Sequence, residues 1–295
     1  MRYQMIVTTS AVGALALLSA LAADARVRSD TGPAARLSAV QQQQDTARAP
    51  GRAGSGPLRV LFIGNSYTYF NDLPSVIADL ARDAREARPI LAEQVTIGGA
   101  TLESHEHGEA MRRIKAGSSR GPWDVVVLQE QSTRPLGDTV KMYSAVRALA
   151  AEIRRVGARP ALYLTWARLA SPRAQDTLSR AYRRIATEVG ALVVPVGEAW
   201  ATIRRTDEVA GRSLFIGDGS HPSPAGTYLA ASTFYATLYG KSPVGLSTPS
   251  RQSEAQPPPG APSGSPVVPL ARALATRLQM AAWQAVTGTD TRAVR

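Results

Sequence analysis

Short apolar stretches rich in β-branched residues alternate with amphipathic stretches through the middle of this chain. A regular alternation of strand and helix signals predicts a parallel sheet with helices on both faces, because each parallel connection needs a crossover. The roughly 190 residues from 58 to 246 suffice for one such α/β domain. The strands are expected at 58–63, 90–97, 123–129, 159–165 and 191–196.

Capping residues mark the expected helices at 73–87, 101–116, 139–156, 172–189 and 224–239. Asp138 and Ser171 are suited to cap the third and fourth helices at their N-termini. Gly157 and Gly240 lie just past two of the C-termini, where glycine adopts the left-handed conformation easily. Ser223 precedes a proline that fits the first position of the last helix.

The first 25 residues resemble a secretory signal peptide. They combine a basic start at Arg2, an apolar stretch at 6–22, and small residues at Ala20 and Ala22. A membrane anchor is the alternative, but the stretch is short and interrupted by Thr and Ser. We therefore expect a secreted or periplasmic protein without stable membrane insertion after signal cleavage.

Two segments lack the periodic apolar pattern of a folded domain. Residues 26–57 are rich in Gln, Ala, Gly, Arg and Ser and are expected to form a disordered linker. Residues 247–266 are rich in Pro and Ser and are expected to be a second linker or loop. Beyond them, 267–286 is expected to be a helix that packs on the domain, and 287–295 a tail.

Composition excludes several classes of function. The chain has no cysteine, so it has no thiol nucleophile, thiolate metal site, disulfide or lipid-modified N-terminal cysteine. Its net charge is +11, and more than half of that excess lies in residues 1–57 and 246–295. The basic residues between these segments are interspersed with acids, without a nucleic-acid-binding motif, so no nucleic-acid partner is expected.

Two short motifs carry the chemistry of a serine nucleophile. Ser66, in Gly64-Asn65-Ser66, directly follows the first predicted strand, where a side chain reaches the edge of a sheet. Asp218 and His221 are three residues apart near the other end of the domain. A hydroxyl attacks only when a base removes its proton, and a carboxylate fixes the imidazole tautomer. Ser66 is therefore predicted as nucleophile, His221 as general base and acid, and Asp218 as its orienting partner.

The two motifs resemble the first and last conserved blocks of the SGNH (GDSL-like) hydrolases, and their order along the domain also fits. The resemblance implies a three-layer α/β/α sandwich with a flavodoxin-like parallel sheet and a shallow site at the strand ends. One block departs from the family pattern. The usual Gly-x-Asn-Asp is replaced by Leu128-Gln129-Glu130-Gln131-Ser132, as in an exported subgroup of the family.

Acyl transfer also needs donors for the negative oxygen that develops in the transition state. The candidates are the backbone N–H groups of Ser66 and Gly99 and a side-chain amide of Gln131 or Gln129. Gly99 matches the second-block glycine of the family. Gln131 falls where the missing asparagine would lie and is slightly favoured over Gln129.

Four further residues near the same edge are candidates for substrate contact: Asn65, His105, Trp166 and Trp200. The two tryptophans would offer a platform for a sugar ring, with ordinary core packing as the competing interpretation. His105-Glu106-His107 lacks the spacing of a metal site. We expect neither a metal nor an organic cofactor.

These features predict an exported serine esterase that hydrolyses O-acyl esters, with acetyl esters of carbohydrates favoured and a small-molecule or glycan ester as substrate. A lipolytic esterase or thioesterase is the first alternative. The second is a non-catalytic glycan-binding or envelope module that retained the fold.

Overall fold

The computed structural model describes residues 56–248 and 270–288. The predicted signal peptide (1–25), nearly all of the first linker (26–57) and most of the second (247–266) lie outside these residues. None of the described helices combines the length and apolar character needed to cross a lipid bilayer.

The five predicted strands are present and form one all-parallel sheet with the order β2-β1-β3-β4-β5. Each begins within two residues of its expected start, and most end one or two residues earlier than predicted, because the residues that follow already belong to the loops or, at Val196, to the next helix. Their bounds are β1 (Leu58–Gly64), β2 (Ile90–Thr96), β3 (Val125–Leu128), β4 (Arg159–Tyr163) and β5 (Leu192–Val194).

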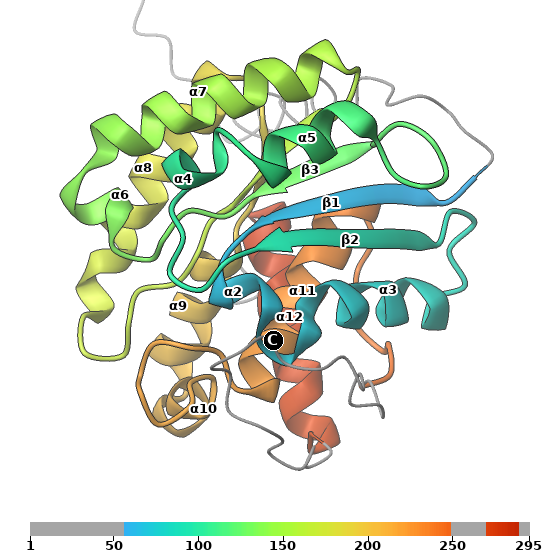
Figure 1. Ribbon diagram of the computed structural model, residues 1–295. Coiled ribbons are helices and arrows are strands. Elements are labelled where there is room, and N and C mark those ends of the chain that lie inside the picture. The colour runs from blue at the N-terminus through green and yellow to red at the C-terminus, as the bar shows by residue number, and fades with distance from the viewer. Residues whose placement is uncertain (1–55, 249–269, 289–295) are drawn as a thin grey trace, which may run out of the picture. The chain divides into compact units, whose positions relative to one another are not determined.

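Helices cover both faces of this sheet, which gives the three-layer α/β/α sandwich (Figure 1). Successive strand side chains point to opposite faces, so Phe62 belongs to one hydrophobic core and Ile63 to the other. One face carries α3 (Leu73–Asp83), α9 (Val196–Thr206) and α11 (Pro224–Tyr239). The other carries α4 (Leu102–His105), α5 (Glu109–Ala116), α7 (Thr139–Arg155) and α8 (Gln175–Glu188).

Several helix boundaries differ from the prediction. The expected helix at 101–116 is two helices, α4 and α5, because Gly108 has a φ of 83°. Ser171 makes no capping hydrogen bond, since the chain first forms the 3₁₀ turn η2 (Pro172–Ala174). Asp138 caps α7 as predicted, accepting a hydrogen bond from the Lys141 N–H. The short elements α2 (Ser66–Tyr69), η1 (Phe70–Asp72), α6 (Arg134–Gly137) and α10 (Glu208–Ser213) were not predicted, and neither was α9.

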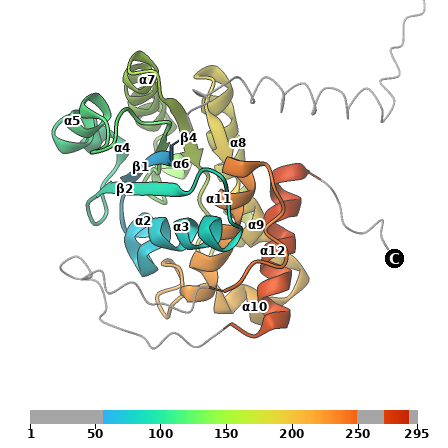
Figure 2. The same cartoon turned by 90° about the vertical axis from the view of Figure 1, so that its right-hand side faces the viewer.

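The last two helices, α11 and α12 (Arg272–Thr287), pack on each other on one face of the sheet. α11 is buried along most of its length, as expected of a helix that is apolar on all sides. The sheet covers one side of it, and α12 packs on another side (Figure 2). Gln279 of α12 is buried and donates hydrogen bonds to the Tyr228 hydroxyl and the Leu246 carbonyl. The predicted C-terminal helix therefore packs on the domain.

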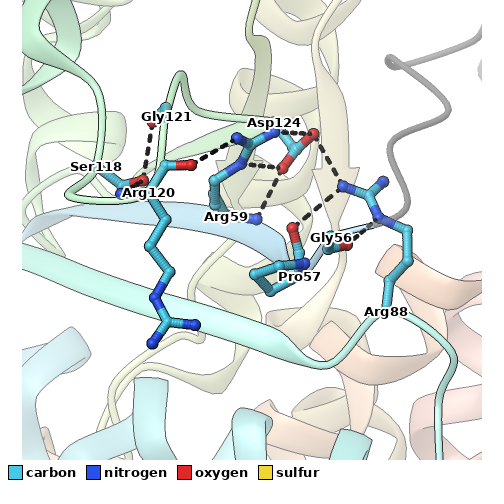
Figure 3. A network of polar contacts seen from close by, with 8 residues as sticks. All are labelled: Gly56, Pro57, Arg59, Arg88, Ser118, Arg120, Gly121 and Asp124. Carbon is cyan, nitrogen blue, oxygen red and sulfur yellow. Dashed lines mark hydrogen bonds and ion pairs between the residues drawn. The ribbon is translucent and has the colours of Figure 1, made fainter.

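A polar network fixes the amino-terminal ends of β1 and β3 (Figure 3). Asp124 accepts hydrogen bonds from the Arg59 backbone N–H at 2.8 Å and Nε at 3.0 Å, and pairs with Arg88 at 3.0 Å. Burial works against ionisation of Asp124, but its partners outweigh burial and lower its pKa. This network and the loops that follow the strands lie at opposite edges of the sheet.

Gly197, in the first turn of α9, tests how closely α9 packs against the loop that follows β4. A Cβ at this position would overlap the backbone carbonyl oxygen of Thr165. We predict that Gly197→Ala destabilises the protein by about 3 kcal/mol or more, measured by urea unfolding. Gly137→Ala is the control, because no atom lies within 4 Å of its Cβ position, and should change stability by less than about 0.5 kcal/mol. Equal effects would contradict the close contact.

Candidate active site

Ser66 lies in a sharp turn from β1 into α2 at the carboxyl edge of the sheet. Asn65 has extended backbone angles, and its side chain accepts a hydrogen bond from the Tyr67 N–H at 3.1 Å, which caps α2. Ser66 is thereby the first residue of α2, and only Asn65 separates it from the end of β1. Only 8% of Ser66 is exposed.

The structure brings the three predicted residues together across the domain. The His221 Nε2 lies 2.8 Å from the Ser66 Oγ, and the His221 Nδ1 contacts the Asp218 carboxylate. The other Asp218 oxygen accepts the backbone N–H groups of Ser220 at 2.8 Å and His221 at 2.9 Å. Burial opposes ionisation of Asp218, but the hydrogen bond to His221 and these two N–H groups lower its pKa. An ionised Asp218 accepts a hydrogen bond from the Nδ1–H group, which fixes the tautomer that leaves Nε2 free to accept the serine proton.

Aromatic rings hold the loop that carries His221. Phe70 is stacked on the imidazole, with ring centroids 4.3 Å apart and planes at 14°. The Tyr67 hydroxyl is 2.7 Å from the Ser220 Oγ, and Trp166 Nε1 donates to the Ser220 carbonyl at 2.9 Å. Phe70 had no signal in the sequence, because it meets His221 only through the fold.

Trp166 and Trp200 do not form a platform for a sugar ring, so that prediction is wrong. They stack on each other with centroids 4.0 Å apart, and Tyr67 stacks on the other side of Trp166 at 4.5 Å. Both tryptophans are at most 1% exposed. They are the packed base of the loop that carries Asp218 and His221.

Gln129 has a role other than the predicted one. Its side-chain oxygen accepts the Asn65 N–H at 2.9 Å and the Thr68 hydroxyl at 3.0 Å, and its Nε2 donates to the Glu130 carbonyl at 2.6 Å. Only 1% of the residue is exposed. Gln129 therefore positions the turn that carries Ser66 and is not an oxyanion donor.

The Gln131 side chain is held by its oxygen, and its amide N–H groups stay unpaired among the described residues. Its side-chain oxygen accepts the N–H groups of Thr133 at 2.8 Å and Arg134 at 3.0 Å at the start of α6. Within residues 56–248 and 270–288, its amide nitrogen has no hydrogen-bond partner. The oxygen anchors the amide and leaves two N–H groups for a ligand.

Two backbone donors lie at the same edge. Gly99 has a φ of 70° in a turn closed by the Ala100 N–H on the Ile97 carbonyl at 3.1 Å. In the described part of the chain, neither the Gly99 N–H nor the Ser66 N–H has an acceptor. Both are unpaired donors at the carboxyl ends of neighbouring strands.

The buried side chains of Asn65 and His105 fix the loops at this edge and are not exposed for contact with a substrate. Asn65 Nδ2 donates to the Ala100 carbonyl at 2.8 Å, and His105 Nε2 donates to the Gly64 carbonyl at 2.9 Å. They are 3% and 2% exposed. Burial lowers the pKa of His105, which favours the neutral ring. The described residues contain no group of three or more His, Cys, Asp or Glu side chains that could hold a metal ion.

Glu130 is a buried acid that the sequence analysis did not single out, although its place two residues after a fully apolar strand was a signal. It is fully buried, and its Oε1 accepts the N–H groups of Leu102 at 3.1 Å and Gln131 at 2.6 Å. Its Oε2 is buried without a partner among the described residues. Burial raises the pKa of Glu130 and outweighs the opposing effect of these two hydrogen bonds.

This raised pKa predicts a dependence of stability on pH. The folded protein holds the Glu130 proton at pH values where the unfolded chain has lost it, so its contribution is complete at low pH and lost as pH rises. Glu130→Gln cannot ionise. The melting temperature of Glu130→Gln minus that of the wild type should therefore increase between about pH 4 and about pH 8. A difference that stays constant or shrinks over this range, measured by calorimetry, would contradict the raised pKa.

Comparison with known proteins identifies the fold. No profile of a known protein family matches the chain, and no curated protein is significantly similar in sequence. A solved structure from Slackia heliotrinireducens, assigned to the SGNH hydrolases, is 28% identical with a TM-score of 0.51 and covers 62% of this chain and 99% of its own.

Two further structures are similar in fold. A DUF4886 family protein from Bacteroides uniformis is 20% identical with a TM-score of 0.57, covering 78% of this chain and 95% of its own. An acetyl xylan esterase is 14% identical with a TM-score of 0.50, covering 61% of this chain and 99% of its own. The exported subgroup stays a prediction. The two sequence blocks, the parallel sheet and the similarity to the Slackia structure show that this chain has the fold of the SGNH (GDSL-like) hydrolases.

Proposed function

We propose that this protein is an exported serine esterase that hydrolyses O-acyl esters, with Ser66 as nucleophile, His221 as general base and acid, and Asp218 as its orienting partner. The proposal rests on the continuous hydrogen-bonded chain from the Ser66 hydroxyl through the His221 ring to the Asp218 carboxylate. In this arrangement a weak nucleophile gains a base and the base gains a fixed tautomer.

The reaction proceeds in two halves. The Ser66 Oγ attacks the ester carbonyl carbon while His221 Nε2 takes the hydroxyl proton. The tetrahedral oxyanion then collapses, the bond to the alcohol breaks, and His221 returns the proton to the leaving alcohol. Water repeats these steps on the acyl-serine and releases the acid. Preorganised donors stabilise both tetrahedral oxyanions, and we assign them to the Ser66 and Gly99 N–H groups and the Gln131 amide.

Acetyl groups on carbohydrates are the substrates we favour. The acyl group must fit beside a serine held in a tight turn at the sheet edge, and an acetyl group needs room for only one methyl group. One fold relative is an acetyl xylan esterase, and the signal-like residues 1–25 are consistent with access to polysaccharide outside the cytoplasm.

A fluorophosphonate probe tests this function directly, because it labels only an activated serine. Labelling of the purified protein should be followed by a panel of acetylated sugars and esters of increasing acyl length. Labelling with turnover of acetylated sugars supports the proposal. Preference for long acyl chains would instead indicate a lipolytic esterase or thioesterase, and a folded protein that is not labelled would indicate a non-catalytic module.

The three catalytic residues predict a graded set of losses. Ser66→Ala and His221→Ala should each reduce kcat by about 1000-fold or more while the protein stays folded. Asp218→Asn should also be severe, because an amide holds the wrong imidazole tautomer. Folding is checked by circular dichroism. Turnover within about tenfold of wild type in folded Ser66→Ala would refute the assignment.

Gln131→Glu isolates the proposed oxyanion donor from the structural role of the same side chain. Glutamate keeps an oxygen for the Thr133 and Arg134 N–H groups, but it replaces the donating nitrogen with an acceptor. We expect kcat to fall about 100- to 1000-fold with little change in KM or melting temperature. Gln129→Ala, by contrast, should lower melting temperature as well as kcat. An unchanged kcat in Gln131→Glu would show that backbone donors suffice.

A further inference from the structure

The Glu130 carboxyl joins the two loops that carry the proposed oxyanion donors. Its Oε1 accepts one hydrogen bond from the Leu102 N–H, at the end of the loop that contains Gly99. The same oxygen accepts another from the N–H of Gln131. One atom therefore connects the backbone donor after β2 to the side-chain donor after β3.

Two side chains from outside the Gly99 loop fix the stretch that follows Gly99, and Glu130 is one of them. Asn65 Nδ2 holds the carbonyl of Ala100, and Glu130 holds the N–H of Leu102. Gly99 lies between β2 and these contacts. Its φ of 70° is a value that residues other than glycine rarely adopt. Before the turn, the Ile97 N–H donates to the Gly64 carbonyl at 3.2 Å, so removing the Glu130 contact would leave the side after Gly99 fixed by Asn65 alone.

Core packing alone is a poor explanation for an acid at this position. Glu130 is fully buried, and its second oxygen has no partner in the described residues. A buried carboxyl with an unpaired oxygen costs stability that an apolar side chain of similar size would not. Unlike an apolar residue, Glu130 provides an oxygen that accepts hydrogen bonds from two backbone N–H groups.

We infer that Glu130 is a positioning residue for ester hydrolysis, which sets the place of the Gly99 and Gln131 donors relative to Ser66. This inference rests on the proposed function. Glu130 touches no reacting atom in it and acts through the two loops. Displacement of a donor by about 1 Å is enough to cost roughly 100-fold in rate, because oxyanion stabilisation depends on geometry.

Two variants separate this role from a purely structural one. Glu130→Ala removes the acceptor and should lower kcat about 100-fold with KM changed less than about twofold. Glu130→Gln keeps an oxygen acceptor in the same place, so its kcat should stay within about threefold of wild type. Gln279→Ala is the matched control, since Gln279 is also buried and bridges several partners, but on α12. It should lower melting temperature without changing kcat.

Amide hydrogen exchange provides a readout that does not depend on activity. The Leu102 and Gln131 N–H groups should exchange faster in Glu130→Ala than in wild type or Glu130→Gln, because only the alanine variant leaves them without an acceptor. Unchanged exchange, or unchanged kcat in folded Glu130→Ala, would overturn the inference. Wild-type protein without esterase turnover would instead refute the proposed function and, with it, the catalytic part of the inference.

Discussion

The hydrogen bond from the Asn65 N–H to the Gln129 side-chain oxygen is the contact on which the site depends. It joins the turn after β1 to the end of β3, and it lies directly before the residue that carries the nucleophile. Asn65 in turn holds the loop after β2 through the Ala100 carbonyl. Because parallel strands end at one edge of the sheet, these few contacts fix three loops against one another.

Polar side chains serve different purposes at the two edges of the sheet. At the amino-terminal edge, Asp124 is paired with two arginines, and all of these charges serve the alignment of strands. At the carboxyl edge, donors at Ser66, Gly99 and Gln131 are left without partners among the described residues. Unsatisfied polar groups cost stability, so their concentration at one edge is typical of a binding site.

The strands, the sheet and the meeting of Ser66 with His221 followed from local patterns, because apolar runs and parallel topology dictate which loops share an edge. Side-chain direction did not follow. Gln129 and Gln131 are two residues apart, yet Gln131 accepts hydrogen bonds from the nearby Thr133 and Arg134 N–H groups at the start of α6. Gln129 is instead buried under the Ser66 turn by contacts with Asn65 and Thr68, far along the chain. Trp166 was misjudged for the same reason, since burial is decided by the layer that packs on it.

The close packing of α12 on α11 changes what counts as the domain. The alternating pattern ends near residue 246, but Leu278 and Ala282 of α12 are completely buried in the same core as the sheet. A fragment that stopped at residue 246 would expose the apolar side of α11 to water and invite aggregation. Conversely, a protease cut between 249 and 269 would leave two pieces with a shared core, able to hold together as a non-covalent complex.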